Sequence, residues 1–218
     1  MAKQLENEYP FDEQLTPDQI RRALSGDFDG FKYFFENCMV LQDRDTRQFV
    51  HPKMNKGQEM IARTILSYVD KETRATTHRE CVILGPRQFG KSTLLTSIAS
   101  YIEAYVSGME NLNIVHTMHQ ATAAAKFFKQ KMAPIITSVN PSIFPTILRD
   151  TMGTSTLLQY KDVKGIRRGG YYEITSAGSN SVRSGTVSVW LCDEPSEYRN
   201  PEAVEDSVSG AISSYGWS

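Results

Sequence analysis

The sequence predicts an α/β fold in which helices flank a mostly parallel central sheet, preceded by a small helical segment. Three observations lead to this fold class. Short apolar runs alternate with longer runs of helical composition through the middle of the chain. The apolar runs are continuous, which is typical of strands buried on both faces of a parallel sheet. A glycine-rich loop also joins one apolar run directly to a helical run.

The first helix is expected near residue 17, where the sequence carries a start signal. Thr16 is a suitable N-cap, Pro17 suits the first helical position, and Gln19 completes a capping box. The aromatic-rich run 29–40 predicts a second helix. Residues 41–54 are then expected to form a polar connection or a small hairpin.

An amphipathic helix is expected over residues 55–71, because Ile61 and Ile65 recur at a spacing of four. The main domain is expected to begin with this helix. The chain of 218 residues has the length for one well-buried domain with a small appendage. We therefore divide it into a helical, lid-like segment over residues 1–54 and a core over residues 55–218.

Strands and helices are expected to alternate from residue 81 onwards. Crossovers between consecutive parallel strands are right-handed, which gives a mostly parallel sheet with both faces covered. The expected strands are 81–84, 113–117, 154–161, 171–177 and 187–192; the expected helices are 91–107, 121–132 and 201–213, and a turn is expected over 162–170.

A phosphate-binding loop is the most specific motif in the sequence. Gly85, Gly90, Lys91 and Ser92 fit the pattern G-x-x-x-x-G-K-[ST] without a gap. Glycines let backbone N–H groups converge on phosphate oxygens, the lysine reaches the β and γ phosphates, and the serine hydroxyl ligates Mg²⁺. The following helix points its N-terminus at the anion. The expected nucleotide-binding residues of the loop are Gly85, Pro86, Arg87, Gln88, Phe89, Gly90, Lys91, Ser92 and Thr93.

An acidic pair, Asp193 and Glu194, follows the apolar run 187–192. A buried strand that ends in an acid predicts that Asp193 holds Mg²⁺ together with Ser92. Glu194 is suited to polarise a water molecule against the γ-phosphate. A small-molecule kinase has no need of a water-activating carboxylate there, so the pair favours hydrolysis of ATP.

Arg87 lies inside the loop, four residues before Lys91. Its guanidinium group is expected to reach the γ-phosphate in cis and to spread the charge that develops during phosphoryl transfer. A structural salt bridge that shapes the loop is the alternative, and the sequence leaves it open.

Four stretches in the same order resemble the ATPase domain of the large terminase subunits of tailed bacteriophages. The stretch GPRQFGKST is similar to the phosphate-binding loop of that family, and NIVHTMHQATAAAKFF is similar to the strand and alanine-rich helix that follow it. The stretch ITSAGSNSVRSGTVSVWLCDEPSEY is similar to the turn and strand that lead to the acidic pair, and KMNKGQEMI resembles the family's glutamine motif. The resemblance covers about residues 30–215.

The resemblance implies a P-loop NTPase of the ASCE type, the class with a catalytic glutamate, and it implies roles for individual residues. Gln58 would contact adenine, and Arg183 would reach the nucleotide of the neighbouring subunit. For Gln58 a solvated helix position, and for Arg183 an anchor of its own turn, remain alternatives. The implied catalytic residues are Glu194, Lys91, Arg87 and Arg183, and the implied metal ligands are Ser92 and Asp193.

The function implied is an ATPase motor module that moves double-stranded DNA into a capsid in the cytoplasm of an infected bacterium. The implied cofactors are ATP and Mg²⁺. The implied partners are double-stranded DNA, further copies of the chain in a ring, the capsid portal and the small terminase subunit. The sequence is expected to stop before the hydroxyl-rich coupling motif and the nuclease domain of the family, which leaves independent turnover by this chain in question.

Two other functions remain open. One is a helicase-like or other nucleic-acid remodelling ATPase, and the other is a nucleotide-binding assembly or regulatory partner without robust turnover. For contact with DNA phosphates, two basic stretches are candidates, although each also fits a solvated surface or a subunit contact. They consist of Lys126, Lys129 and Lys131, and of Lys161, Lys164, Arg167 and Arg168.

The overall composition sets limits on these functions. The net charge is −1, so a polyanion would have to be met by a local basic patch. No apolar run is long enough to cross a bilayer and the N-terminus lacks a signal core, so we expect an intracellular protein without a membrane partner. Cys38, Cys81 and Cys192 are expected to be reduced thiols, and His116 and His119 lack the partners of a metal site.

Overall fold

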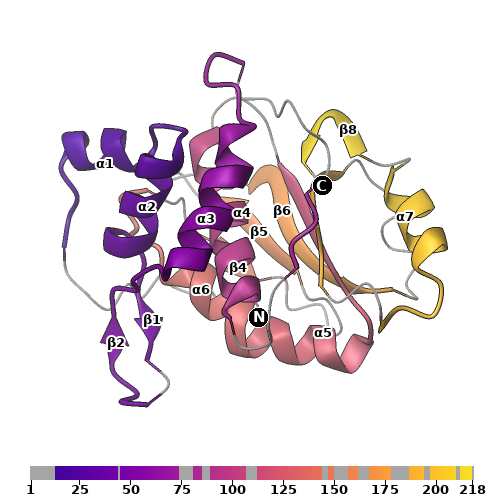
Figure 1. Cartoon of the computed structure of the whole chain (residues 1–218). Coiled ribbons are helices and arrows are strands. Elements are labelled where there is room, and N and C mark those ends of the chain that lie inside the picture. Colours follow the sequence, from indigo (N-terminus) through magenta and orange to yellow (C-terminus); the bar gives the residue numbers. More distant parts are fainter. Residues whose placement is uncertain are drawn as a thin grey trace.

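The computed structural model has a six-stranded sheet at its centre, with the strand order β4-β5-β6-β3-β7-β8 (Figure 1). The strands are β3 (Asn113–Met118), β4 (Ile147–Arg149), β5 (Leu157–Lys161), β6 (Arg167–Ser176), β7 (Val187–Cys192) and β8 (Ile212–Trp217). The residues that the structure describes are 13–43, 45–73, 81–84, 89–106, 112–143, 147–149, 157–161, 167–177, 187–193, 197–209 and 212–217.

The sheet is mixed, and the expectation of a mostly parallel sheet was wrong for one side of it. β3 pairs in parallel with β6 and β7, and β7 pairs in parallel with β8. β5 is antiparallel to both β4 and β6. The connection between β5 and β6 spans only residues 162–166, whereas a parallel crossover needs about a dozen residues or more. The short connection therefore dictates an antiparallel pair.

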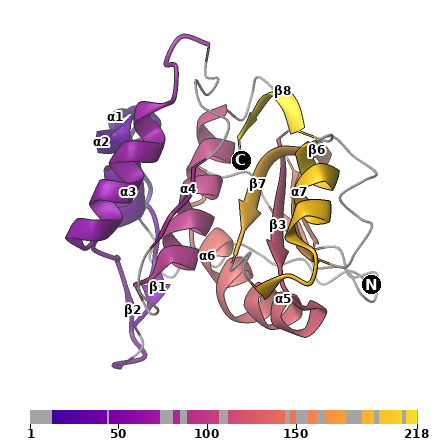
Figure 2. The ribbon, with the colours of Figure 1, turned by 45° about the vertical axis from the view of Figure 1, so that its right-hand side comes forward.

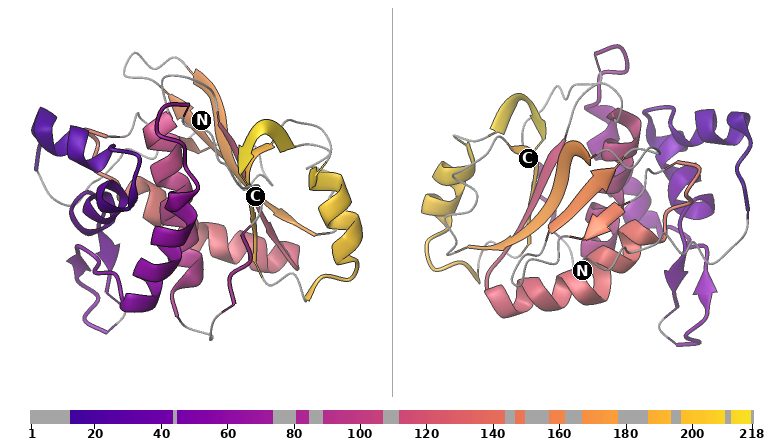
Figure 3. Two further views of the ribbon diagram at one scale, coloured as in Figure 1. Left: turned by 45° about the horizontal axis from the view of Figure 1, so that its top comes forward. Right: turned by 180° about the vertical axis from the view of Figure 1, so that it is seen from behind.

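Helices from the middle of the chain cover one face of the sheet. The helix α4 (Lys91–Val106) lies between the sheet and the N-terminal helices (Figure 2). It is followed by α5 (Ala121–Phe127), the π-helical turn η1 (Phe128–Met132) and α6 (Ala133–Thr137), which form a continuous helical rod. The expected helices 91–107 and 121–132 are thus confirmed, and the second of them continues to Thr137. Helix α7 (Pro201–Ser209) lies on the opposite side of the sheet from α4 (Figure 3).

The N-terminal segment packs on α4 through aromatic side chains. Its elements are α1 (Pro17–Ala23), α2 (Phe28–Asn37) and a hairpin of β1 (Leu41–Gln42) and β2 (Phe49–Val50), and α3 (Lys56–Ser67) follows as the first helix of the core. Phe31 and Phe34 of α2 lie edge-on to Tyr101 of α4, with ring centroids 5.3 Å and 5.5 Å away. The predicted capping box of Thr16 and Gln19 is present, and so is the small hairpin. All three aromatic side chains are buried, so α2 and α4 share one core.

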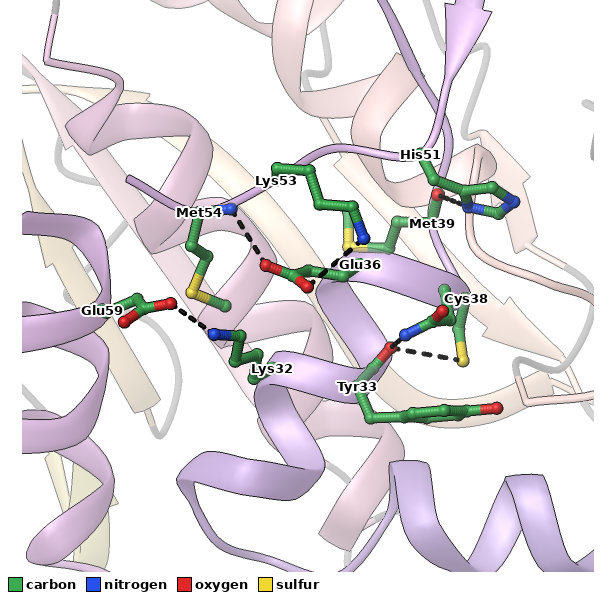
Figure 4. A network of polar contacts seen from close by, with 10 residues as sticks. Lys32, Tyr33, Glu36, Cys38, Met39, His51, Lys53, Met54 and Glu59 are labelled. Atoms are coloured by element: carbon green, nitrogen blue, oxygen red, sulfur yellow. Dashed lines mark hydrogen bonds and ion pairs between the residues drawn. The ribbon is translucent and has the colours of Figure 1, made fainter. Parts of the chain in front are cut away.

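Polar contacts fix the start of α3 against α2 (Figure 4). Glu36 of α2 accepts a hydrogen bond from the backbone N–H of Met54 at 3.2 Å and pairs with Lys53 at 3.4 Å. Lys32 of α2 forms an ion pair with Glu59 of α3. These contacts hold the first turn of α3 in place, and this turn carries Gln58.

Two expected elements at the ends of the core were wrong. Residues 81–84 do not form a strand, and Val82 and Leu84 are 74% and 92% exposed. A run of four apolar residues is too short to specify a strand unless a neighbouring strand pairs with it. The last helix ends at Ser209 rather than at residue 213, and the chain then forms β8 beside β7.

None of the described helices combines the length and the apolar composition that a membrane span requires.

Candidate nucleotide and magnesium site

The end of the predicted phosphate-binding loop leads directly into α4. Gly90 has a φ angle of +80°, in the left-handed region that glycine adopts without strain. Lys91, Ser92 and Thr93 form the first turn of the helix. The backbone carbonyl of Gly90 accepts a hydrogen bond from the N–H of Leu94 at 3.0 Å, so the helical bonding begins at the glycine. This is the loop-to-helix junction that the motif predicts.

The structure brings Ser92 and Asp193 together although they are 101 positions apart. The hydroxyl group of Ser92 donates a hydrogen bond to Oδ2 of Asp193 at 3.0 Å. Ser92 stands in the first turn of α4, and Asp193 directly follows β7. The backbone N–H of Asp193 bonds the carbonyl of Thr117 at 3.1 Å, which extends the pairing of β3 and β7 by one residue. The two predicted metal ligands thus lie side by side.

The donor atoms at this place suit a magnesium ion. Mg²⁺ prefers hard oxygen ligands, and here a hydroxyl and a carboxylate oxygen lie 3.0 Å apart. Mg²⁺ commonly takes only one or two protein ligands and completes its shell with water and phosphate oxygens. In the described ranges, no three His, Cys, Asp or Glu side chains gather as a metal cluster. A Mg²⁺ ion held by these two oxygen atoms would therefore take most of its remaining ligands from water and phosphate.

His116 lies near Asp193 and is fully buried on β3. Burial lowers the pKa of His116 to about 4, against the negative charge of Asp193, which acts to raise it. The imidazole is therefore neutral near pH 7. Its ring packs edge-on against Phe127 of α5, with centroids 4.9 Å apart.

The side-chain amide of Gln58 lies against the backbone of the loop, and Gln58 is only 7% exposed. Its Oε1 accepts a hydrogen bond from the N–H of Asn55 at 3.1 Å, which completes a capping box at the start of α3. Its Nε2 lies 3.5 Å from the carbonyl oxygens of both Phe89 and Gly90, at the long end of the hydrogen-bonding range. The structure thus brings Gln58 to the loop and engages both ends of its amide, so that the alternative of a solvated helix position was wrong.

Phe89 packs against the same turn of α3. A Cβ atom added to Gly57 would lie 2.2 Å from Cζ of Phe89, so the aromatic ring occupies the space that a larger residue at position 57 would need. The side chain of Phe89 therefore anchors the loop to α3.

The remaining predicted site residues lie outside the described residues. They are Gly85, Pro86, Arg87, Gln88, Arg183 and Glu194.

Sequence analysis missed a group of side chains around Thr117, beside Asp193. The Oγ1 atom of Thr117 accepts a hydrogen bond from the indole N–H of Trp190 at 2.9 Å and lies 3.4 Å from Oγ1 of Thr175. The hydroxyl group of Tyr198 donates to the carbonyl of Thr117 at 2.7 Å. No motif marks these residues, because their contacts depend on the register of three strands. An aromatic residue shortly after an acidic pair was the one available signal.

The basic stretches lie apart from each other along the chain. Lys126, Lys129 and Lys131 are exposed on α5 and η1, and Lys131 lies over the ring of Phe127 at 5.9 Å. Arg167 and Arg168 belong to the start of β6 and not to the expected turn, because β6 begins at Arg167. Lys164 lies outside the described residues.

Comparison of the sequence with models of protein families and with curated proteins gave no match.

Proposed function

We propose that this chain is a Mg²⁺-dependent ATP hydrolase that acts as the motor module of a DNA-packaging terminase. The observation that carries the proposal is the hydrogen bond of 3.0 Å between Ser92 and Asp193. The loop motif predicts Ser92 as a metal ligand, and the acid at the end of the strand 187–192 predicts Asp193 as its partner. Their meeting across 101 positions supports a shared metal site.

Each residue of the site has a role in the proposed reaction. The backbone of the loop and the ammonium group of Lys91 bind the triphosphate. Ser92 and Asp193 hold Mg²⁺, which when bound neutralises charge on the β- and γ-phosphate oxygens. Glu194 directly follows Asp193 and accepts a proton from the attacking water. Arg87 stabilises the charge of the transferred phosphoryl group in cis, and Arg183 does so for a neighbouring copy.

The assignment to DNA packaging rests on the resemblance of the ordered motifs to the terminase family. Under this proposal the chain works in a ring with copies of itself, on a capsid portal and with the small terminase subunit. Double-stranded DNA is contacted through phosphates by clustered lysines, of which the exposed set Lys126, Lys129 and Lys131 is one candidate. The lysines would give affinity without reading the base sequence.

ATP hydrolysis by the purified chain, with and without capsid components, tests the proposal. The parent is expected to hydrolyse ATP only in the presence of Mg²⁺. The Glu194→Ala variant is expected to bind ATP and to lose turnover by about a hundredfold or more, as is typical when a general base is removed. The Lys91→Ala variant is expected to lose nucleotide affinity as well.

The control is Arg21→Ala on α1, which removes a highly exposed basic side chain that pairs with the equally exposed Asp18. It is expected to keep the activity of the parent. A parent that binds ATP without turnover, even with capsid components, would favour a regulatory partner. A parent that binds no nucleotide would contradict the proposed function.

A further inference from the structure

A single backbone carbonyl at the end of β3 accepts two hydrogen bonds from the chain that follows β7. The carbonyl oxygen of Thr117 lies 3.1 Å from the backbone nitrogen of Asp193 and 2.7 Å from the hydroxyl oxygen of Tyr198. A carbonyl oxygen has two lone pairs, so both donors can be satisfied together. Asp193 and Tyr198 are five positions apart and are therefore fixed at the same atom.

The hydroxyl group of Tyr198 is held as a donor by its surroundings. Tyr198 is 7% exposed, and burial raises the pKa of its hydroxyl far above the ordinary value. The group therefore keeps its proton at any physiological pH. The thiol of Cys192 lies 3.2 Å from the same hydroxyl oxygen and donates to it. The hydroxyl thus has a defined donor on one side and a defined acceptor on the other.

The acceptor is a rigid part of the molecule. Thr117 is 1% exposed and lies on β3, which is paired on both sides, with β6 and with β7. Its side chain is held in addition by the indole N–H of Trp190 at 2.9 Å. Because this carbonyl is fixed, it restrains the positions of both donors that bond to it.

We propose that Tyr198 is a positioning residue that holds Asp193 in the geometry needed for the metal ion. The inference rests on the proposed function, in which Asp193 is a ligand of Mg²⁺. Tyr198 does not contact the metal or the nucleotide in this proposal. It fixes the chain beyond Asp193 to the end of β3, so that the carboxylate stays at 3.0 Å from the hydroxyl group of Ser92.

The Tyr198→Phe variant removes one hydroxyl oxygen and keeps the aromatic ring in its place. One hydrogen bond of ordinary strength corresponds to a change of about threefold to tenfold in an equilibrium constant. The Mg²⁺ concentration for half-maximal ATP hydrolysis is therefore expected to rise by about threefold to tenfold. Affinity for ATP measured in EDTA is expected to change by less than about twofold, because the loop that binds the phosphates is unaffected.

A second measurement is independent of activity. Hydrogen exchange of the Asp193 amide, measured without nucleotide or metal, is expected to be faster in Tyr198→Phe than in the parent. The matched control is Tyr33→Phe, which makes the same chemical change on α2, away from the acidic strand end. It is expected to leave both the Mg²⁺ dependence and the Asp193 exchange rate as in the parent.

The outcomes separate the role of Tyr198 from the proposed function. An active parent with a Tyr198→Phe variant of unchanged Mg²⁺ dependence and unchanged Asp193 exchange would overturn the role of Tyr198 alone. The same role would be overturned if Tyr33→Phe gave equal changes. A parent that binds no nucleotide in Mg²⁺ or in EDTA would overturn the proposed function itself, and the exchange rate of Asp193 would still test the hydrogen bond.

Discussion

At the scale of single residues, Asp27 shows how one carboxylate serves both a helix end and a contact between distant parts of the chain. It caps α2 by accepting a hydrogen bond from the N–H of Gly30 at 2.8 Å, and it pairs with Lys71 at 2.7 Å. Burial acts to raise the pKa of Asp27, but the hydrogen bonds from Lys71, Ser25 and Gly30 outweigh it and lower the pKa to about 2. The charged carboxylate therefore stabilises the folded state.

The Asp27→Asn variant keeps a capping side chain and removes the charge. Because the pKa of Asp27 is depressed in the folded state, its stabilisation is present above the pKa of the unfolded chain and is lost as the pH falls through about 4 to about 2. The parent is thus expected to be more stable than Asp27→Asn at pH 6, and the difference is expected to shrink below pH 4. Urea unfolding at a series of pH values measures it.

The Asp18→Asn variant is the control, since Asp18 forms an ion pair with Arg21 in which both side chains are highly exposed. Exposed pairs contribute little to stability, so no comparable dependence on pH is expected. If the difference in the free energy of unfolding between the parent and Asp27→Asn stayed constant down to pH 2, the charge of Asp27 would not be the source of the stabilisation.

At the scale of elements, the first turn of α3 supports the phosphate-binding loop from outside. The ring of Phe89 fills the space above Gly57, and the amide of Gln58 lies against the carbonyls of Phe89 and Gly90. The same turn is held on α2 by Lys32, which pairs with Glu59. The N-terminal helices and the loop are thus connected through one helical turn, so a change in that turn is expected to alter the loop.

The Gly57→Ala variant tests this connection. A Cβ atom at position 57 would meet Cζ of Phe89 at 2.2 Å, so the ring has to move, and we expect the loop that carries it to shift as well. Overpacking of this kind costs about 1–3 kcal/mol, of which one part lowers the free energy of unfolding and another part weakens binding. Affinity for ATP is therefore expected to fall by about tenfold. Affinities for ATP, GTP and tripolyphosphate, measured by calorimetry, are expected to fall together.

The Met60→Ala variant on the exposed side of α3 is the control and is expected to bind all three ligands as the parent does. If Gly57→Ala weakened only ATP, the turn would act on the base and not on the loop, which would contradict this account.

At the scale of the whole molecule, the parts predicted correctly from the sequence are those with a strong local pattern. The helix from Lys91, the strand Val187–Cys192 and the capping box of Thr16 depend on neighbours in the sequence and were predicted closely. The loop motif and the acid at the strand end also predicted that Ser92 and Asp193 lie together, and their oxygen atoms are 3.0 Å apart. Alternation of strands and helices was sufficient to predict the α/β class.

The parts that could not be predicted depend on partners far away in the sequence. Residues 81–84 have the composition of a strand but lie outside the sheet, and residues 212–217 form β8 because β7 offers an edge to them. The antiparallel pairing of β5 with β6 follows from the short connection between them. The sequence did not define the length of this connection, because the start of β6 at Arg167 carries only a weak strand signal. The contact between Tyr198 and Thr117 joins residues 81 positions apart, and no local pattern predicts it.

Binding of ATP with and without Mg²⁺, measured by calorimetry on the parent and on Asp193→Asn, tests the central claim most directly. Under the proposed function, in which Ser92 and Asp193 would hold the metal, the parent is expected to bind ATP about tenfold or more tightly in Mg²⁺ than in EDTA. The account predicts that Asp193→Asn loses most of this difference and keeps its affinity in EDTA. A parent without affinity for ATP, or an Asp193→Asn variant that retains the full effect of Mg²⁺, would contradict the account.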